Sequence, residues 1–328
     1  MILMGALLGV VRVSHSLHHG TQQGLEMQEN VRAALNFVCR ELINAGSGIP
    51  YLTTINGSPP IAVPVGALLG PLGQPVNNGL VYFATPSNAD GEPVTLDGEG
   101  NALGAPIQTD RLVFLGGMGD CRFVKQSAPG PTSGWGAIVF VEDNSIFSQG
   151  EVVLITNGFQ VSLGQITQVL ANDKLQFSNG QDPLGLNSPG NGQTPNPNYY
   201  AAQQIPGGPP PLVYPLASIT YFVDSTTDPV HPALKRLSNN AGGAASAATV
   251  SDNIENFQVT FLVDQDANAT TPSITLDSPT INQLSLIRGA TVTITGRSQV
   301  RMEDRNNADG HNRLTMSQTV FFRNNIRR

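Results

Sequence analysis

Charged residues are scarce in this chain: Asp, Glu, Lys and Arg together make up 12% of its 328 residues. Ordinary globular proteins contain about 25% of these residues. Coiled coils and charged disordered tails both need many charges, so the composition argues against them. The formal net charge of −7 gives no general attraction to nucleic acid or to an anionic membrane surface. We therefore expect no nucleic-acid partner.

Cysteine and histidine are also rare, with two and five residues. Cys39 and Cys121 lie far apart and belong to no CxxC motif or Cys/His cluster, which excludes a zinc ribbon or a thioredoxin motif. From the residues alone, they could form one structural disulfide or remain two separate buried thiols. The motifs GxSxG, GxxxxGK[ST] and HExxH are absent as well. We expect that the protein is not an enzyme and has no cofactor.

Glycine and proline are plentiful instead, with 35 and 24 residues, and 40% of the chain is hydrophobic. This combination supplies a buried core and favours a loop-rich β protein over a disordered chain. Nine of the prolines lie between Pro183 and Pro215, in a segment without a charged residue. We interpret residues 183–215 as a long surface loop rather than as a second core.

The amino-terminal end has the pattern of one long helix. Residues 2–13 are apolar except for two glycines and Arg12. This run is too short to span a bilayer, which needs about 20 residues, and we interpret it as the carboxyl half of a membrane anchor. Two glycines and Pro50 stop the pattern, so we predict a helix over 1–46 and a β-rich domain over 47–328. Apolar residues recur on one face of this helix at Met27, Val31, Ala34, Val38 and Leu42.

The rest of the chain reads as antiparallel sheet with long Pro/Gly-rich loops, which makes the fold class α+β. Several segments alternate apolar and polar residues, as strands with one solvated face do. The predicted strands are Leu80–Ala84, Arg111–Leu115, Ala137–Val141, Val152–Thr156, Phe159–Leu163, Leu175–Phe177, Ile219–Val223, Phe257–Val263, Thr291–Thr295 and Thr315–Phe322.

Three stretches of the sequence, in the correct order, carry a resemblance to a known family. Residues 28–46 have the order QEN-R-AL, then R-E, then AG; residues 148–157 read SQGEVVLITN; residues 313–324 read RLTMSQTVFFRN. Together with a long amino-terminal helix leading into a β domain, they resemble the PilW-like minor pilins of type IV pili. The chain begins MILMG and lacks the family's processing glycine and Phe-Thr-Leu-x-Glu start. We therefore interpret it as starting inside the family's helix.

The resemblance implies a structural subunit that is incorporated into a type IV pilus or primes its assembly, at the tip rather than in the shaft. Its implied partners are other pilins, the inner membrane before assembly, and a tip adhesin or a surface. The implied location is the inner membrane and then an extracellular filament of a bacterium. Two alternatives share the helix-plus-sheet plan: a pseudopilin of a type II secretion system, and an adhesin mounted on a pilin helix.

The residues expected to mediate assembly lie in the apolar part of the helix, where Gly5 and Gly9 form a small-xxx-small pair. Val31, Leu35 and Val38 could also take part, but packing against the β domain is the preferred interpretation for residues beyond about 25, where the helix is amphipathic. The full set in the first part of the helix is Gly5, Leu7, Leu8, Gly9, Val10, Val11, Val13 and Leu17.

Two further expectations concern cysteine and calcium. The periplasmic route implied by the resemblance favours a disulfide between Cys39 and Cys121. Asp264, Asp266 and Asn268 have the D-x-D-x-N spacing of a calcium loop, although the glycine at its sixth position is missing. A turn after a strand also uses Asp and Asn. Residues 264–268 could therefore form either a calcium-binding loop or an ordinary turn.

Overall fold

We analysed a computed structural model, which describes residues 2–45, 63–64, 80–81, 87–117, 121–129, 137–157, 161–178, 181, 187, 202–204, 206–239, 247–265, 273–277, 287–299 and 310–322. One long helix is followed by antiparallel strands, so the predicted α+β class is confirmed. Helix α1 covers Ile2–Ile43 as one element, close to the predicted bounds. A turn follows it, with the Ala45 amide bonded to the Leu42 carbonyl.

All ten predicted strands overlap strands of the structure, and nine further strands were not predicted. The first half of the strands comprises β1 (Val63–Pro64), β2 (Leu80–Val81), β3 (Ser87–Asp90), β4 (Val94–Leu96), β5 (Ala102–Ile107), β6 (Asp110–Gly117), β7 (Arg122–Pro129), β8 (Ala137–Val141), β9 (Val152–Thr156) and β10 (Val161–Gln165). The second half comprises β11 (Gln168–Leu170), β12 (Lys174–Phe177), β13 (Leu212–Asp224), β14 (Ala233–Asn239), β15 (Ala248–Asp252), β16 (Ile254–Val263), β17 (Ile274–Leu276), β18 (Ile287–Arg297) and β19 (Arg313–Phe321).

Two sheets and the helix enclose the larger hydrophobic core. One sheet has the order β17-β16-β18-β19, and the other includes β15, β14, β13, β6 and β3 in a branched sheet of 11 strands. Buried side chains from both sheets meet those of α1 in a single cluster. The helix contacts β15 of one sheet and β18 and β19 of the other, so it packs against both sheets. The hairpin of β4 and β5 adds Val94, Leu103 and Ile107 to the same cluster.

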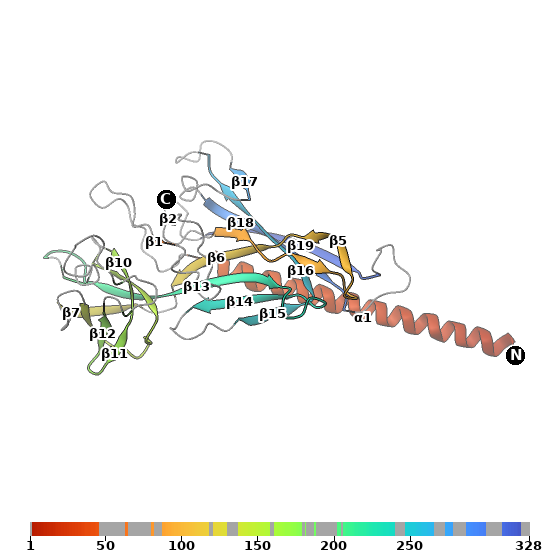
Figure 1. The fold of residues 1–328 in the computed structure, drawn as a ribbon, viewed down its shortest axis with the longest axis horizontal. Helices are drawn as coiled ribbons and strands as arrows, with labels where there is room; N and C mark the ends of the chain where they lie inside the picture. The colour runs from red at the N-terminus through yellow and green to blue at the C-terminus, as the bar shows by residue number, and fades with distance from the viewer. Residues whose placement is uncertain are drawn as a thin grey trace.

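A second hydrophobic core lies at the end of the molecule away from the free end of the helix (Figure 1). It is built from β7, β8, β9 and β12, with Ile166, Ala202 and Val213. Strand β13 joins the two cores, because Val213 near its start lies in the second core and Tyr221 near its end lies in the first. The sequence predicted one β-rich domain core and a loop over 183–215; the last four residues of that loop belong to β13 instead.

Candidate functional site

The carboxyl-terminal part of α1 is docked on the sheets. Its inward face buries Val31, Ala34, Val38 and Leu42 completely. Gly296 on β18 makes this approach possible, because a Cβ atom there would lie 2.5 Å from Cγ2 of Val31. Four of the five residues of the predicted apolar face are therefore buried, and the fifth, Met27, is partly exposed. We call the part of α1 from Val31 to Ile43 the docked half of the helix.

The preceding part of the helix has no comparable contact. Among the side chains described between Val11 and Asn30, none is buried. Val11 is 57% exposed and Leu25 is 55% exposed. Figure 1 shows this part of α1, which we call the free half, extending away from both sheets to the amino terminus. The prediction that the first half of the helix protrudes is confirmed.

The residues predicted to mediate assembly fall into two groups. Val31, Leu35 and Val38 lie in the core of the chain itself, so they are not available to a neighbouring subunit. Of the earlier set, Val11 is exposed. The side chains of the others lie outside those described, although their backbone is helical: Gly5, Leu7, Leu8, Gly9, Val10, Val13 and Leu17. Within the described residues, no helix is both long enough and apolar enough to cross a membrane.

A polar contact fixes the docked half near its carboxyl end. The Tyr221 hydroxyl donates a hydrogen bond of 2.5 Å to the Glu41 carboxylate, and Arg236 Nε donates to both oxygens of the same carboxylate at 3.1 and 2.9 Å. Burial, together with the Glu41 charge, raises the pKa of Tyr221 far above its ordinary value. Although burial works against the guanidinium charge, Glu41 raises the pKa of Arg236. Glu41 therefore joins helix α1 to β13 and β14 through one charged hydrogen-bond network.

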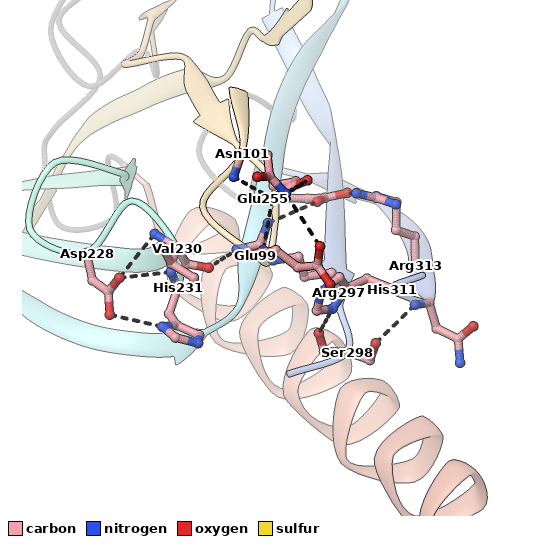
Figure 2. Close-up of polar contacts among 12 residues, drawn as sticks. Glu99, Asn101, Asp228, Val230, His231, Glu255, Arg297, Ser298, His311 and Arg313 are labelled. Atoms are coloured by element: carbon pink, nitrogen blue, oxygen red, sulfur yellow. Dashed lines mark hydrogen bonds and ion pairs between the residues drawn. The ribbon is translucent and has the colours of Figure 1, made fainter. Parts of the chain in front are cut away.

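A second group of charges lies where the helix leaves the sheets. Glu255 is 2% exposed and lies in a β-bulge of β16. Its carboxylate accepts a hydrogen bond of 2.5 Å from Arg313 Nε. The same carboxylate lies 4.0 Å from the Nη1 atom of Arg297. Arg297 also donates to the Val230 carbonyl in the turn between β13 and β14. We call Glu255, Arg297, Arg313 and Val230 the exit cluster; Figure 2 shows Glu255 between the two arginines, above α1.

His311 closes this end of the fold beside the exit cluster. It is 2% exposed, and its Nδ1 atom lies 2.8 Å from the Ser298 carbonyl oxygen. Its ring packs against Gly98 in the turn of the β4–β5 hairpin, where a Cβ atom would collide with the imidazole. Gly100 of the same turn adopts a φ of +83° and faces Val230. The β4–β5 turn therefore contacts both His311 and the β13–β14 turn where the helix exits.

The structure gives the Asp264 carboxylate a different role from the predicted calcium ligand. It forms an ion pair with Arg288 and accepts a 2.7 Å hydrogen bond from the Ser273 hydroxyl. Asp266 and Asn268 lie outside the described residues. Among the residues that the structure describes, no group of three or more acidic, His or Cys side chains could hold a metal ion.

The predicted disulfide is wrong, because Cys39 and Cys121 are both free thiols. Cys39 packs in the first core among the helix residues, where burial raises the pKa of its thiol to about 11. Cys121 precedes β7, which contributes to the second core. Because the two cysteines are not bonded to each other, the helix is held on the sheets by packing and by the contacts of Glu41.

The sequence analysis missed both charged networks. In a chain with so few charges, Glu41 within an amphipathic helix and Glu255 just before an alternating run were the available signals. Comparison with protein-family models, curated proteins and solved structures finds no match for the chain. The docked and free halves of α1 are therefore the main structural evidence bearing on function.

Proposed function

We propose that this chain is a minor pilin, a structural subunit that enters or primes a type IV pilus through its amino-terminal helix. The observation that carries the proposal is the division of α1 into a docked half with fully buried side chains and a free half with none among those described. A helix without tertiary contacts is marginal in water, since most helix stability in proteins comes from packing. The free half therefore needs contacts from outside the chain.

In this proposal, the apolar first part of the helix sits in the inner membrane before assembly and then packs against the helices of other pilins. In lipid, helix contact depends on close packing rather than on apolar burial, and Gly5 and Gly9 allow such close approach. Repeated head-to-tail contacts give an open filament instead of a closed ring. The mature location is then an extracellular filament.

The second core supports a position at the tip. The strands around this core, β7, β8, β9 and β12, lie at the end of the molecule away from the free half (Figure 1). We call them the second body, which is bulky for a subunit of a repeating shaft. The same observation favours one alternative, an adhesin carried on a pilin helix. Both versions are non-catalytic, and they differ in whether the second body contacts a surface or another subunit.

The test replaces Gly5 and Gly9 by Leu in the full-length gene of the bacterium that produces the protein. We expect less of the variant in sheared filaments, because bulkier side chains keep the helices apart. Gly104→Leu is the matched control: Gly104 faces open space in β5, so filament incorporation should be retained. Measurement of both pilus number and protein secretion separates a minor pilin from a secretion pseudopilin.

Full incorporation of the Gly5/Gly9 variant, with normal pilus number and secretion, would contradict assembly through the helix. A surface-binding defect after removal of the second body, with normal assembly, would select the adhesin alternative.

A further inference from the structure

Strand β19 has an open edge that lacks the usual protection against pairing. Among the described strands, only β18 pairs with β19. Natural sheets protect their edges with short strands, charges, prolines or bulges. Other edge strands here are short, such as β17 and β11 with three residues each. By contrast, β19 has nine residues, no bulge in its register, and neither charge nor proline from Leu314 to Phe321.

The hydrogen bonds of β19 show which backbone groups face outward. The Phe322 amide donates to the Arg288 carbonyl, and the Ser298 amide donates to the Asn312 carbonyl. In an antiparallel ladder, alternate residues bond to the same neighbour, so the even-numbered residues of β19 face β18. The amides and carbonyls of the odd-numbered residues therefore point to the open edge: Arg313, Thr315, Ser317, Thr319 and Phe321.

Although α1 contacts β19, side-chain exposure shows that the middle and the carboxyl end of the strand are open to solvent. Ser317, Gln318 and Thr319 are consecutive and all exposed, although alternate side chains of a strand point to opposite faces. Phe321 at the end of the strand is 63% exposed. An exposed aromatic ring beside outward-facing backbone groups is typical of a surface that another chain covers.

The sequence of the strand is complementary to itself. In an antiparallel pair of two β19 strands centred on Ser317, Ser317 faces its own copy and Thr315 faces Thr319. The molecule already forms such hydroxyl pairs between β18 and β19, with oxygen–oxygen distances of 2.7 to 2.9 Å. Arg313, which is bound to Glu255, would face the exposed ring of Phe321, and no like charges would meet.

We infer that a second copy of this chain pairs with β19 along this edge, in the register centred on Ser317. The two four-stranded sheets then form one continuous sheet. The two-fold axis is perpendicular to that sheet, so the helices of the two copies run in opposite directions. The contact is therefore distinct from a parallel helix bundle and does not rest on the proposed function.

The first experiment measures the mass of the full-length chain in mild detergent by sedimentation, with the Gly5→Leu/Gly9→Leu background to suppress helix association. We expect a dimer. Ser317→Pro removes an outward amide and leaves the β18 ladder intact, so it should weaken the dimer by about tenfold or more. Ser317→Ala keeps the amide and should remain dimeric. A monomeric parent chain, or a Ser317→Pro variant that dimerises as the parent does, would overturn the inference.

Ser317→Lys covers the case in which the proline variant does not fold. It places two ammonium groups opposite each other at the two-fold axis and should give a monomer, whereas Thr293→Lys, one strand inward, should keep the dimer. The register is tested by a thiol crosslinker about 8 Å long in a chain without native cysteines. Ser317→Cys should crosslink, and Thr293→Cys should not, because three strand spacings of about 4.8 Å separate its two copies. The reverse pattern would contradict the register.

Discussion

The docked half of α1, from Val31 onward, places a continuous apolar face on the core, while the free half before it exposes Leu25 and Val11. Both halves belong to one uninterrupted helix. The docked half is stabilised by side-chain burial and by the contact of Glu41 with Tyr221 and Arg236. The free half shows a local contact between Gln22 and Glu26, and at its last residue the Asn30 carbonyl accepts a hydrogen bond from Ser251, but none of its described side chains is buried. The comparison separates residues that stabilise the fold from residues left for other chains.

The largest expected effect comes from the exit cluster, which lies beside the start of the docked half, because Gly296 next to Arg297 packs on Val31. Glu255→Gln removes a buried carboxylate that lies between the buried guanidinium of Arg297 and the more exposed guanidinium of Arg313. Breaking a buried ion pair on one side leaves an uncompensated charge and costs about 3–5 kcal/mol. Urea unfolding measures this loss. Glu29→Gln, on the exposed surface of the free half, should change stability by less than about 0.5 kcal/mol; equal losses would contradict the comparison.

The second prediction compares one leucine from each half. Leu42 is fully buried and Leu25 is 55% exposed. Leu42→Ala should lower the free energy of unfolding by about 2–5 kcal/mol, the range for a leucine removed from a core. Leu25→Ala should leave it within about 0.5 kcal/mol. The comparison of the two halves fails if Leu25→Ala destabilises the isolated chain as much as Leu42→Ala does.

Much of this division was predictable from the sequence, because the three- and four-residue spacing of Val31, Ala34, Val38 and Leu42 marks one face of a helix. The strands with clean alternation, such as Phe257–Val263, were predictable for the same reason. Strands without alternation were missed: β14, for example, carries Lys235 and Arg236 next to each other because both reach partners on other elements.

The networks themselves could not be predicted, since they depend on tertiary contacts. The bulge that aims Glu255 at its arginines has no local signature, and Glu41 meets Tyr221 across 180 residues of sequence. The disulfide prediction failed for a related reason. Counting two cysteines ignores where each one packs, and the chain has two cores rather than one.

The third prediction compares a glycine on the strand beneath the docked half with a glycine within the free half. Gly296→Ala pushes against Val31 and should cost about 1–3 kcal/mol, as overpacking of a core does. Gly24 has nothing within 4 Å of the position of a Cβ atom, so Gly24→Ala should raise helix stability by about 0.5–1 kcal/mol. Far-ultraviolet circular dichroism and thermal unfolding report both changes. A loss of helix signal in Gly24→Ala would show that the free half has contacts of its own.

The smallest expected effect is the loss of stability at low pH near the end of the fold where the helix exits. Asp224 ends β13 and lies 2.5 Å from Lys235 Nζ. Burial disfavours its charge, but the hydrogen bonds from Lys235, Thr226 and Thr227 hold the pKa of Asp224 well below its ordinary value of 3.8. A carboxylate with a depressed pKa in the folded state contributes stability above the pKa of the unfolded state, and that contribution falls as pH drops toward the folded pKa.

Unfolding of the parent chain and of Asp224→Asn should therefore differ by a constant amount between about pH 5 and pH 7, and the difference should shrink below about pH 4. Urea titrations at each pH measure it. Asp228→Asn is the control, because that carboxylate lies exposed in the neighbouring turn with a depressed pKa owed mainly to His231. Its contribution is screened by solvent and should be smaller. A difference for Asp224→Asn that persists unchanged to pH 3 would mean that Lys235 does not hold this carboxylate in solution.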